Sequence, residues 1–132
     1  MTNRLLPFAT LLAACFLVPV RIGLADDAGE MRRIAAASFA AIQADAGLTA
    51  AARAAGSRLF ATHCASCHGA DGKGRRMVGG PDLTDAHWTH GGDPASIMAS
   101  VWDGRKGEMP GFEDRLGPAE RKALTLHVLD LR

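Results

Sequence analysis

Two cysteines and a histidine lie close together near the middle of the chain, in the run Cys64-Ala65-Ser66-Cys67-His68. Two thiols separated by two residues can add across the two vinyl groups on one edge of a porphyrin. The histidine that follows directly would then lie under the iron and supply an imidazole nitrogen as ligand. The motif therefore predicts one c-type haem, bound covalently through Cys64 and Cys67, with His68 as the proximal iron ligand.

Two other interpretations of the cysteine pair fit this sequence less well. A thioredoxin-like redox pair would need a βαβ context, and no alternating strand pattern surrounds Cys64 and Cys67. A zinc site would normally show a second ligand pair at finger spacing, which this sequence lacks. Composition agrees weakly with haem: only 5% of the 132 residues are aromatic and none is tyrosine. A buried porphyrin would supply the missing apolar bulk.

A second axial ligand is expected on the other face of the haem, and Met109 is the best placed of the five methionines. It lies in a Gly- and Pro-rich loop before the last expected helix and is followed by Pro110, which stiffens the approach of the thioether. Met98 is expected to pack in the core from the apolar face of a helix. Met77 is expected on the proximal side. The sequence therefore predicts His68 and Met109 as the two iron ligands.

Three histidines stay open as alternatives for the sixth ligand: His63, His87 and His90. His63 immediately precedes Cys64, so its ring would have difficulty reaching the distal face. His87 and His90 flank Trp88 in a polar stretch, where histidines more often face solvent or form hydrogen bonds.

Two strong-field axial ligands would leave the iron no open coordination position, so we expect one-electron transfer and no enzymatic activity. Burial and a soft thioether both favour ferrous iron, which predicts a reduction potential on the high side. A haem enzyme or gas sensor is a less favoured alternative, since it would need Met109 to be absent or displaceable. A tightly bound cytochrome subunit of an oxidase or dehydrogenase is a third interpretation.

The expected partners are redox proteins, an electron donor and an acceptor, and they include a terminal oxidase or dehydrogenase as candidates. Loops 69–80 and 103–112 are the candidates to frame the haem edge. Basic residues in these loops could steer an acidic partner, namely Lys73, Arg75, Arg76, Arg105 and Lys106. The net charge of +1 and the lack of a Lys/Arg-dense stripe give no case for nucleic acid.

The elements that must position these residues are expected to be helices joined by long loops, an all-α fold. A helix over 50–62, with Thr49 as N-cap, leads directly into Cys64. Asp93-Pro94 is a strong helix start. Pro118 opens a final helix whose inward residues are expected to be Leu124, His127, Val128 and Leu129. Residues 69–92 and 104–117 are expected to be loops, and loops of this length are usually functional.

Residues 1–25 have the pattern of a secretory signal peptide, with Arg4, an apolar stretch over 5–20, and small residues at 23–25 before Asp26. The apolar stretch is interrupted by prolines and is shorter than the roughly 20 residues of a bilayer span. We therefore expect export to the periplasm. Membrane association is expected only if the N-terminal segment is retained uncleaved or is lipidated at Cys15. Both alternatives to a cleaved signal peptide stay open.

Residues 26–48 are expected to be an Ala-rich linker or helix, followed by a cytochrome domain over 49–132. Apolar residues at helical spacing form a narrow stripe in the first of these segments. Gly47 is expected to break the pattern. The stripe consists of Met31, Ala35, Phe39 and Ile42.

Residues from about 53 to 132 resemble a class I cytochrome c domain. The motifs that carry the resemblance are 64–69 (CASCHG), 80–83 (GPDL) and Met109-Pro110, in the order of that family. More narrowly, 69–74 (GADGKG), 81–85 (PDLTD), Trp88, Gly91-Gly92 and Asp103-Gly104-Arg105, which lacks an Asn, are similar to the C-terminal haem domain in the dihaem subunit of cbb-type cytochrome oxidases.

The resemblance implies a small class I fold wrapped around one haem, with further roles for named residues. The Pro81 carbonyl would accept the Nδ1 proton of His68 and so orient the imidazole. Gly56 and Phe60 match the positions where the first helix of that fold crosses the last, and His127 stands where the family usually has an aromatic residue. The oxidase subunit has two haem domains and a transmembrane helix, whereas this sequence has one haem motif. We therefore expect a free or docked single-haem cytochrome.

Overall fold

A computed structural model describes residues 27–106 and 109–132, so the expected signal peptide and Cys15 lie outside the described residues. The described part is all-α, as predicted, and contains no strand, only two isolated backbone bridges. No described helix is both long enough and apolar enough to cross a bilayer. The elements are α1 (Asp27–Ala36), α2 (Phe39–Ala44), α3 (Ala46–His63), α4 (Ala65–His68), the 3₁₀ helix η1 (Arg76–Val78), α5 (Pro94–Asp103) and α6 (Pro118–Asp130).

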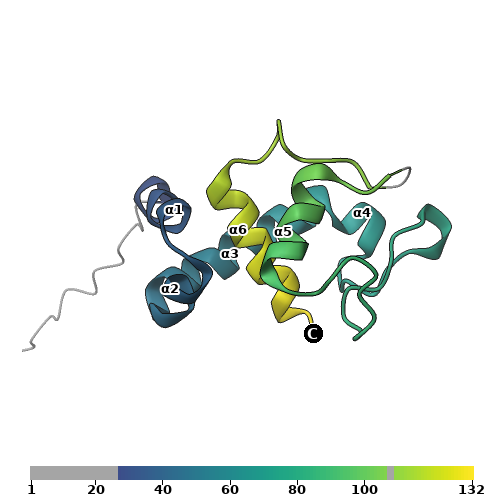
Figure 1. Cartoon of the computed structure of the whole chain (residues 1–132), viewed down its shortest axis with the longest axis horizontal. Helices are drawn as coiled ribbons and strands as arrows, with labels where there is room; N and C mark the ends of the chain where they lie inside the picture. The colour runs from purple at the N-terminus through teal and green to yellow at the C-terminus, as the bar shows by residue number, and fades with distance from the viewer. Residues whose placement is uncertain (1–26, 107–108) are drawn as a thin grey trace, which may run out of the picture.

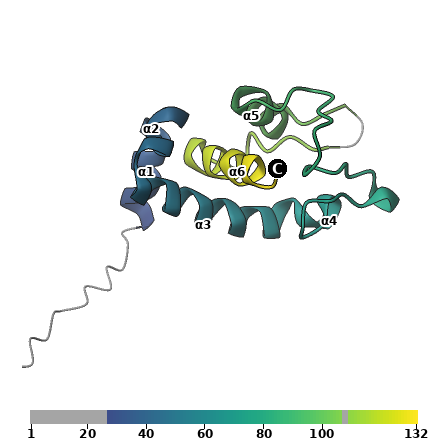
Figure 2. The ribbon, with the colours of Figure 1, turned by 90° about the horizontal axis from the view of Figure 1, so that it is seen from below.

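Helices α3 and α6 form the most extensive helix pair among the described residues. Figures 1 and 2 show α1 and α2 at one end of this pair, α4 at the other end, and α5 alongside α6. The crossing is close at Gly56, where a Cβ would lie far inside van der Waals contact of the Ala123 carbonyl oxygen. Only glycine permits this approach. The family resemblance implied that Gly56 lies at this helix crossing.

Helices α1 and α2 pack on α3 and α6 around a buried core that includes Ile34 and Ile42. The predicted apolar stripe does face this core, since Ile42 is buried and its other members pack against the cluster. The predicted break at Gly47 is wrong, because Gly47 lies in the first turn of α3. The helix is interrupted earlier, before Ser38. The Ser38 side chain accepts a hydrogen bond from Ala41 N and caps the start of α2.

The start of α3 also differs from the prediction, which placed the N-cap at Thr49. The carboxylate of Asp45 caps the helix instead, accepting from Leu48 N at 3.0 Å. The Thr49 hydroxyl donates to the Ile42 carbonyl at 2.6 Å, so it ties α3 to the end of α2. Both residues are good N-caps in isolation, and the fold of α2 against α3 decides between them.

The predicted starts of α5 and α6 are confirmed. Asp93 caps α5, with Pro94 at the first helical position. Pro118 begins α6, and the Glu120 carboxylate accepts from Gly117 N at 2.6 Å. On the inward face of α6, Leu124 and Val128 are buried.

His127 of α6 fills the aromatic position at the helix crossing, with its ring centroid 5.1 Å from that of Phe60. Burial lowers the pKa of His127, and the nearby Asp130 carboxylate opposes this shift in part. The folded chain therefore favours the neutral imidazole at this contact.

We predict that Gly56→Ala lowers the free energy of unfolding by about 1–3 kcal/mol, the usual cost of overpacking. The added methyl would force α3 and α6 apart. Ser57→Ala is the matched control, because Ser57 is exposed on the same turn of α3. Urea unfolding of the haem-loaded protein, followed by circular dichroism, measures both. Equal midpoints for the two variants would contradict the close crossing.

We predict that His127 makes the fold less stable in acid. Because its pKa is lower in the folded than in the unfolded chain, the unfolded chain binds more protons. Its contribution to stability is therefore complete above the unfolded value of about 6.5 and is lost as the pH falls below it. His127→Phe should flatten the dependence of the unfolding free energy on pH below about pH 7. An unchanged slope in that variant would show that this imidazole does not titrate with folding.

Candidate haem site

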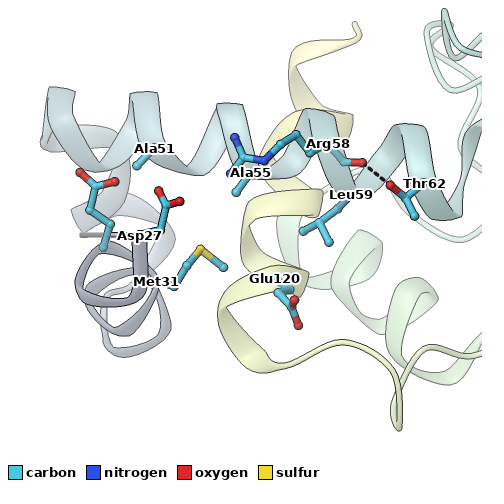
Figure 3. Close-up of a pocket in the computed structure, with 9 residues that line it drawn as sticks. Asp27, Met31, Ala51, Ala55, Arg58, Leu59, Thr62 and Glu120 are labelled. Carbon is cyan, nitrogen blue, oxygen red and sulfur yellow. Dashed lines mark hydrogen bonds between the residues drawn. The ribbon is translucent and has the colours of Figure 1, made fainter. Parts of the chain in front are cut away.

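Two of the hollows among the described residues differ in chemistry. The smaller, of about 270 Å³, lies between α1, α3 and α6 (Figure 3), and its polar groups are the carboxylates of Asp27, Glu30 and Glu120, with Arg58 and Thr62. No thiol or imidazole lines this hollow, and its one sulfur atom is that of the Met31 thioether. The larger, of about 610 Å³, is lined by Cys64, Cys67, His68 and Met109 together. The larger cavity is therefore the candidate site.

The cysteine motif lies where α3 passes directly into α4. Cys64 ends α3 and precedes α4, so the helical turn sets the spacing of both sulfurs along the cavity wall. Cys64 is buried, Cys67 is exposed, and the two do not form a disulfide. Burial, and secondarily the Cys67 thiol, raises the pKa of Cys64 to about 11. The attacking thiol of a redox pair needs a lowered pKa, so this environment disfavours Cys64 in that role.

A zinc site also finds no support in the described part of the chain, where no three His, Cys, Asp or Glu side chains come together as a metal cluster.

The imidazole of His68 is buried and held in one orientation. Its Nδ1 lies 3.1 Å from the Pro81 carbonyl oxygen. When Nδ1 carries the proton and donates to that carbonyl, Nε2 keeps its lone pair for a metal. This is the contact that the family resemblance implied.

The loop that carries Pro81 is tied down by backbone hydrogen bonds. Gly74 N donates to His68 O at 2.7 Å, and Arg75 N donates to Gly80 O at 2.9 Å. Gly80 passes so close to the Cys67 backbone that a Cβ would collide with the Cys67 carbonyl. The position of the carbonyl opposite His68 is therefore fixed by close backbone packing and not by a regular element.

Met109 reaches the same cavity from the loop after α5. Gly104, at φ +71°, ends α5 in a conformation that favours glycine. Arg105 and Met109 then exchange two backbone hydrogen bonds, of 2.9 and 3.2 Å. Phe112 N closes the loop back onto Val101 O at 3.0 Å. These bonds hold the segment that presents the thioether.

The three alternative histidines line the cavity as well, so lining alone does not distinguish Met109 from His63, His87 and His90. The ring of His63 packs edge-on against Phe112, with centroids 6.0 Å apart, while His87 and His90 are exposed. Met98 does not line the cavity, and the Met77 side chain is fully exposed. Of the methionines in the described residues, Met109 alone lines the cavity.

The rest of the cavity wall fits a large flat apolar group. Its buried apolar lining comes from three helices and the loop at 104–117, and comprises Phe60, Ile97, Val101, Phe112, Leu124 and Val128. A volume of about 610 Å³ is within the usual range for cofactor sites. The donor set, the pinned imidazole and the apolar wall together fit a haem. Sequence reasoning missed Ser100 and Arg115 in the lining, because neither belongs to a motif.

Comparison with known proteins points in the same direction. The family model described as cytochrome c oxidase, cbb3-type, subunit III matches residues 51–128. The chain is 47% identical over 73 residues to the cbb3-type cytochrome c oxidase subunit FixP of Azorhizobium caulinodans, a match covering 55% of this chain and 25% of that protein. It is 46% identical over 79 residues to subunit CcoP of Cereibacter sphaeroides, covering 60% and 27%. The chain thus spans about a quarter of the length of these relatives.

Solved structures of c-type cytochromes share the fold. KustC0563, a c-type cytochrome, is 30% identical with a TM-score of 0.53, over 58% of this chain and 96% of that one. Cytochrome cL of Methylophaga aminisulfidivorans is 26% identical with a TM-score of 0.54, over 60% of this chain and 52% of that one. The match to the family model, over residues 51–128, leaves out α1 and α2.

Proposed function

We propose that this chain, which belongs to the cbb3-type cytochrome c oxidase subunit III family, is a single-haem c-type cytochrome that carries one electron at a time between redox proteins in the periplasm. Its iron would be ligated by His68 and Met109, and its haem attached through Cys64 and Cys67. The observation that supports this most is the meeting of these four side chains at one apolar cavity.

The haem, when bound, supplies an iron that cycles between the ferric and ferrous states. The residues of the chain bind and tune it. The Pro81 carbonyl orients His68 and makes its imidazole a better ligand. The buried apolar wall excludes water, which favours the less charged ferrous state. With His68 and Met109 both committed to the iron, no position is left for a substrate, so we propose that the chain is not an enzyme by itself.

Electron exchange needs a part of the haem near the surface, and the cavity lining offers one on the side of Cys67 and Val78. Cys67 is exposed, and Val78 retains 52% of its accessible surface. Lys73 and Arg76, in the neighbouring loop, are exposed as well and would favour an acidic partner. Contacts between such carriers and their partners are usually small and transient.

The names of the relatives support a second candidate, a cytochrome subunit held permanently on a terminal oxidase. Copurification discriminates the two. A free carrier would elute at the size of the chain after export, whereas a bound subunit would elute with a larger membrane complex.

We predict that the exported protein gains the mass of one haem and keeps it through acid–acetone extraction. Both thioether bonds are expected, because Cys64 and Cys67 both line the cavity beside His68. Cys67→Ser should leave a single thioether and shift the pyridine haemochrome band to longer wavelength. Haem that is extractable from the unsubstituted protein would overturn the covalent assignment. The same intact mass reports where the mature chain begins, which we propose to be Asp26, without a lipid on Cys15.

We predict that Met109 ligates the iron in both oxidation states. Met109→His should keep the iron low-spin but lower the reduction potential markedly, since imidazole stabilises ferric iron more than thioether does. Met109→Ala should abolish the weak charge-transfer band of the thioether–ferric bond at the red end of the visible spectrum. Met77→Ala is the matched control, because that side chain is fully exposed. The assignment fails if Met109→Ala changes nothing while His87→Ala or His90→Ala removes the band or shifts the potential.

A further inference from the structure

The segment 84–92 forms one wall of the candidate haem cavity without belonging to a helix. Its largest side chain is that of Trp88, which is half-buried, lines the cavity and packs against the apolar core around it. The residues His87, Thr89 and His90, which also line the cavity, are exposed. Trp88 is therefore the side chain with which this wall keeps water out of the cavity.

Most hydrogen bonds of this segment in the described part of the chain are local. The Trp88 indole N–H donates to the Asp85 carbonyl at 3.0 Å, and Gly91 N donates to the Trp88 carbonyl at 3.3 Å. Arg132, which follows α6, makes a different kind of bond: its Nη2 donates to the Gly92 carbonyl at 2.7 Å. Among the described residues, this is the only hydrogen bond that ties segment 84–92 to a residue distant in sequence.

The guanidinium of Arg132 also lies over the indole of Trp88, with its central carbon 5.0 Å from the ring centroid. A Cβ on Gly92 would lie 2.9 Å from both Arg132 Nη1 and Trp88 Cγ, so both groups close on the same backbone position. The neighbouring Leu131 packs on the loop after the cysteine motif, where a Cβ on Gly72 would lie 2.8 Å from Leu131 Cδ1. Figures 1 and 2 show the end of the chain, marked C, beside these loops.

The contacts of Arg132 differ from those of the ion-paired arginines. Arg53 binds the Asp130 carboxylate across two helices at 2.6 Å. Arg132 is exposed, and it binds a carbonyl and an aromatic ring that both belong to one loop. Exposed contacts of this kind add little to the stability of a whole domain. Their effect is instead on where that loop lies.

We propose that Arg132 is a positioning residue of the haem site: it clasps segment 84–92 and holds Trp88 against the bound haem, so that this wall excludes water and small ligands from the iron. The inference rests on the proposed function, because the haem is the group that the wall covers. A cation over an indole ring and a hydrogen bond to a carbonyl are each modest at a surface. Together they should favour the closed position about tenfold, which corresponds to about 1.4 kcal/mol.

The first measurement follows Trp88 itself. A bound haem quenches the emission of a tryptophan beside it, so an opened segment adds a long-lived component to the fluorescence decay. In the haem-loaded protein, Arg132→Ala should raise the amplitude of that component about tenfold. Trp88→Leu gives the background from Trp102, the other tryptophan of the chain. Arg58→Ala is the matched control and should change nothing, because Arg58 is an exposed arginine at the smaller hollow.

The second measurement tests what the wall does. The rate at which added imidazole binds the ferric iron should rise about tenfold in Arg132→Ala, because the opened wall admits the ligand. Arg132→Lys keeps the charge and a donor but not the planar fork, so it should recover part of both effects. In the Trp88→Leu background, Arg132→Ala should change the imidazole rate much less, since the two residues act through one contact.

The proposal is overturned if Arg132→Ala matches Arg58→Ala in fluorescence decay and imidazole rate. It also fails if Arg132→Ala has its full effect on the imidazole rate in the Trp88→Leu background, because Arg132 would then not act through Trp88. Where Arg132→Ala does not load haem, Arg132→Gln serves: it keeps an amide donor but not the charge over the ring, and the absence of any effect in it refutes the inference. Intact mass separates the two hypotheses. An unsubstituted protein without haem would refute the proposed function, whereas normal haem mass without the Arg132 effect would refute this inference alone.

Discussion

The close approach of α3 and α6 at Gly56 is the constraint on which the rest of the structure depends. A side chain there would collide with the α6 backbone, so the two helices approach this closely only with glycine at position 56. Helix α3 runs from that crossing straight into Cys64, and α6 continues from it to Leu124 and Val128. The cavity therefore receives its cysteine motif from one helix and part of its apolar wall from the other. Because rigid helices transmit their orientation along their length, the crossing determines where both features lie.

The ligand-bearing segments are held by a different means, since neither belongs to a long helix. Pro81 faces His68 because backbone hydrogen bonds and the close packing of Gly80 fix the loop around it. Met109 faces the cavity because Arg105 pairs with its backbone next to the end of α5. Loops of this kind position a side chain without requiring the apolar periodicity of a helix.

The parts of this fold that sequence predicted well are those governed by local chemistry. The starts of α5 and α6 follow from Asp93-Pro94 and Pro118, whose backbone preferences are intrinsic. The start of α3 was missed because Asp45 and Thr49 can both cap a helix. In the fold, the Thr49 hydroxyl donates to the Ile42 carbonyl of α2, and Asp45 caps α3. The cavity wall was predicted where it coincides with a motif or, as at Leu124 and Val128, with the inward face of a predicted helix. The hydrogen bond from Arg105 to the Ser100 hydroxyl was not predicted, because it joins a helix to a loop through side chains that carry no pattern.

Helices α1 and α2, which lie outside the residues matched by the family model, pack on α3 and α6 away from the cavity. The core beneath α1 and α2 and the core around the cavity are separate clusters, and Leu59 and Leu129 border both. Lys122 of α6 donates to the Ala35 and Ala37 carbonyls at 2.6 Å each, so it binds the end of α1 in the way that basic side chains complete helix C-termini. None of these contacts reaches the cavity lining. Helices α1 and α2 therefore stabilise the crossing of α3 and α6 from outside, which separates the stability of the domain from the chemistry of its haem site.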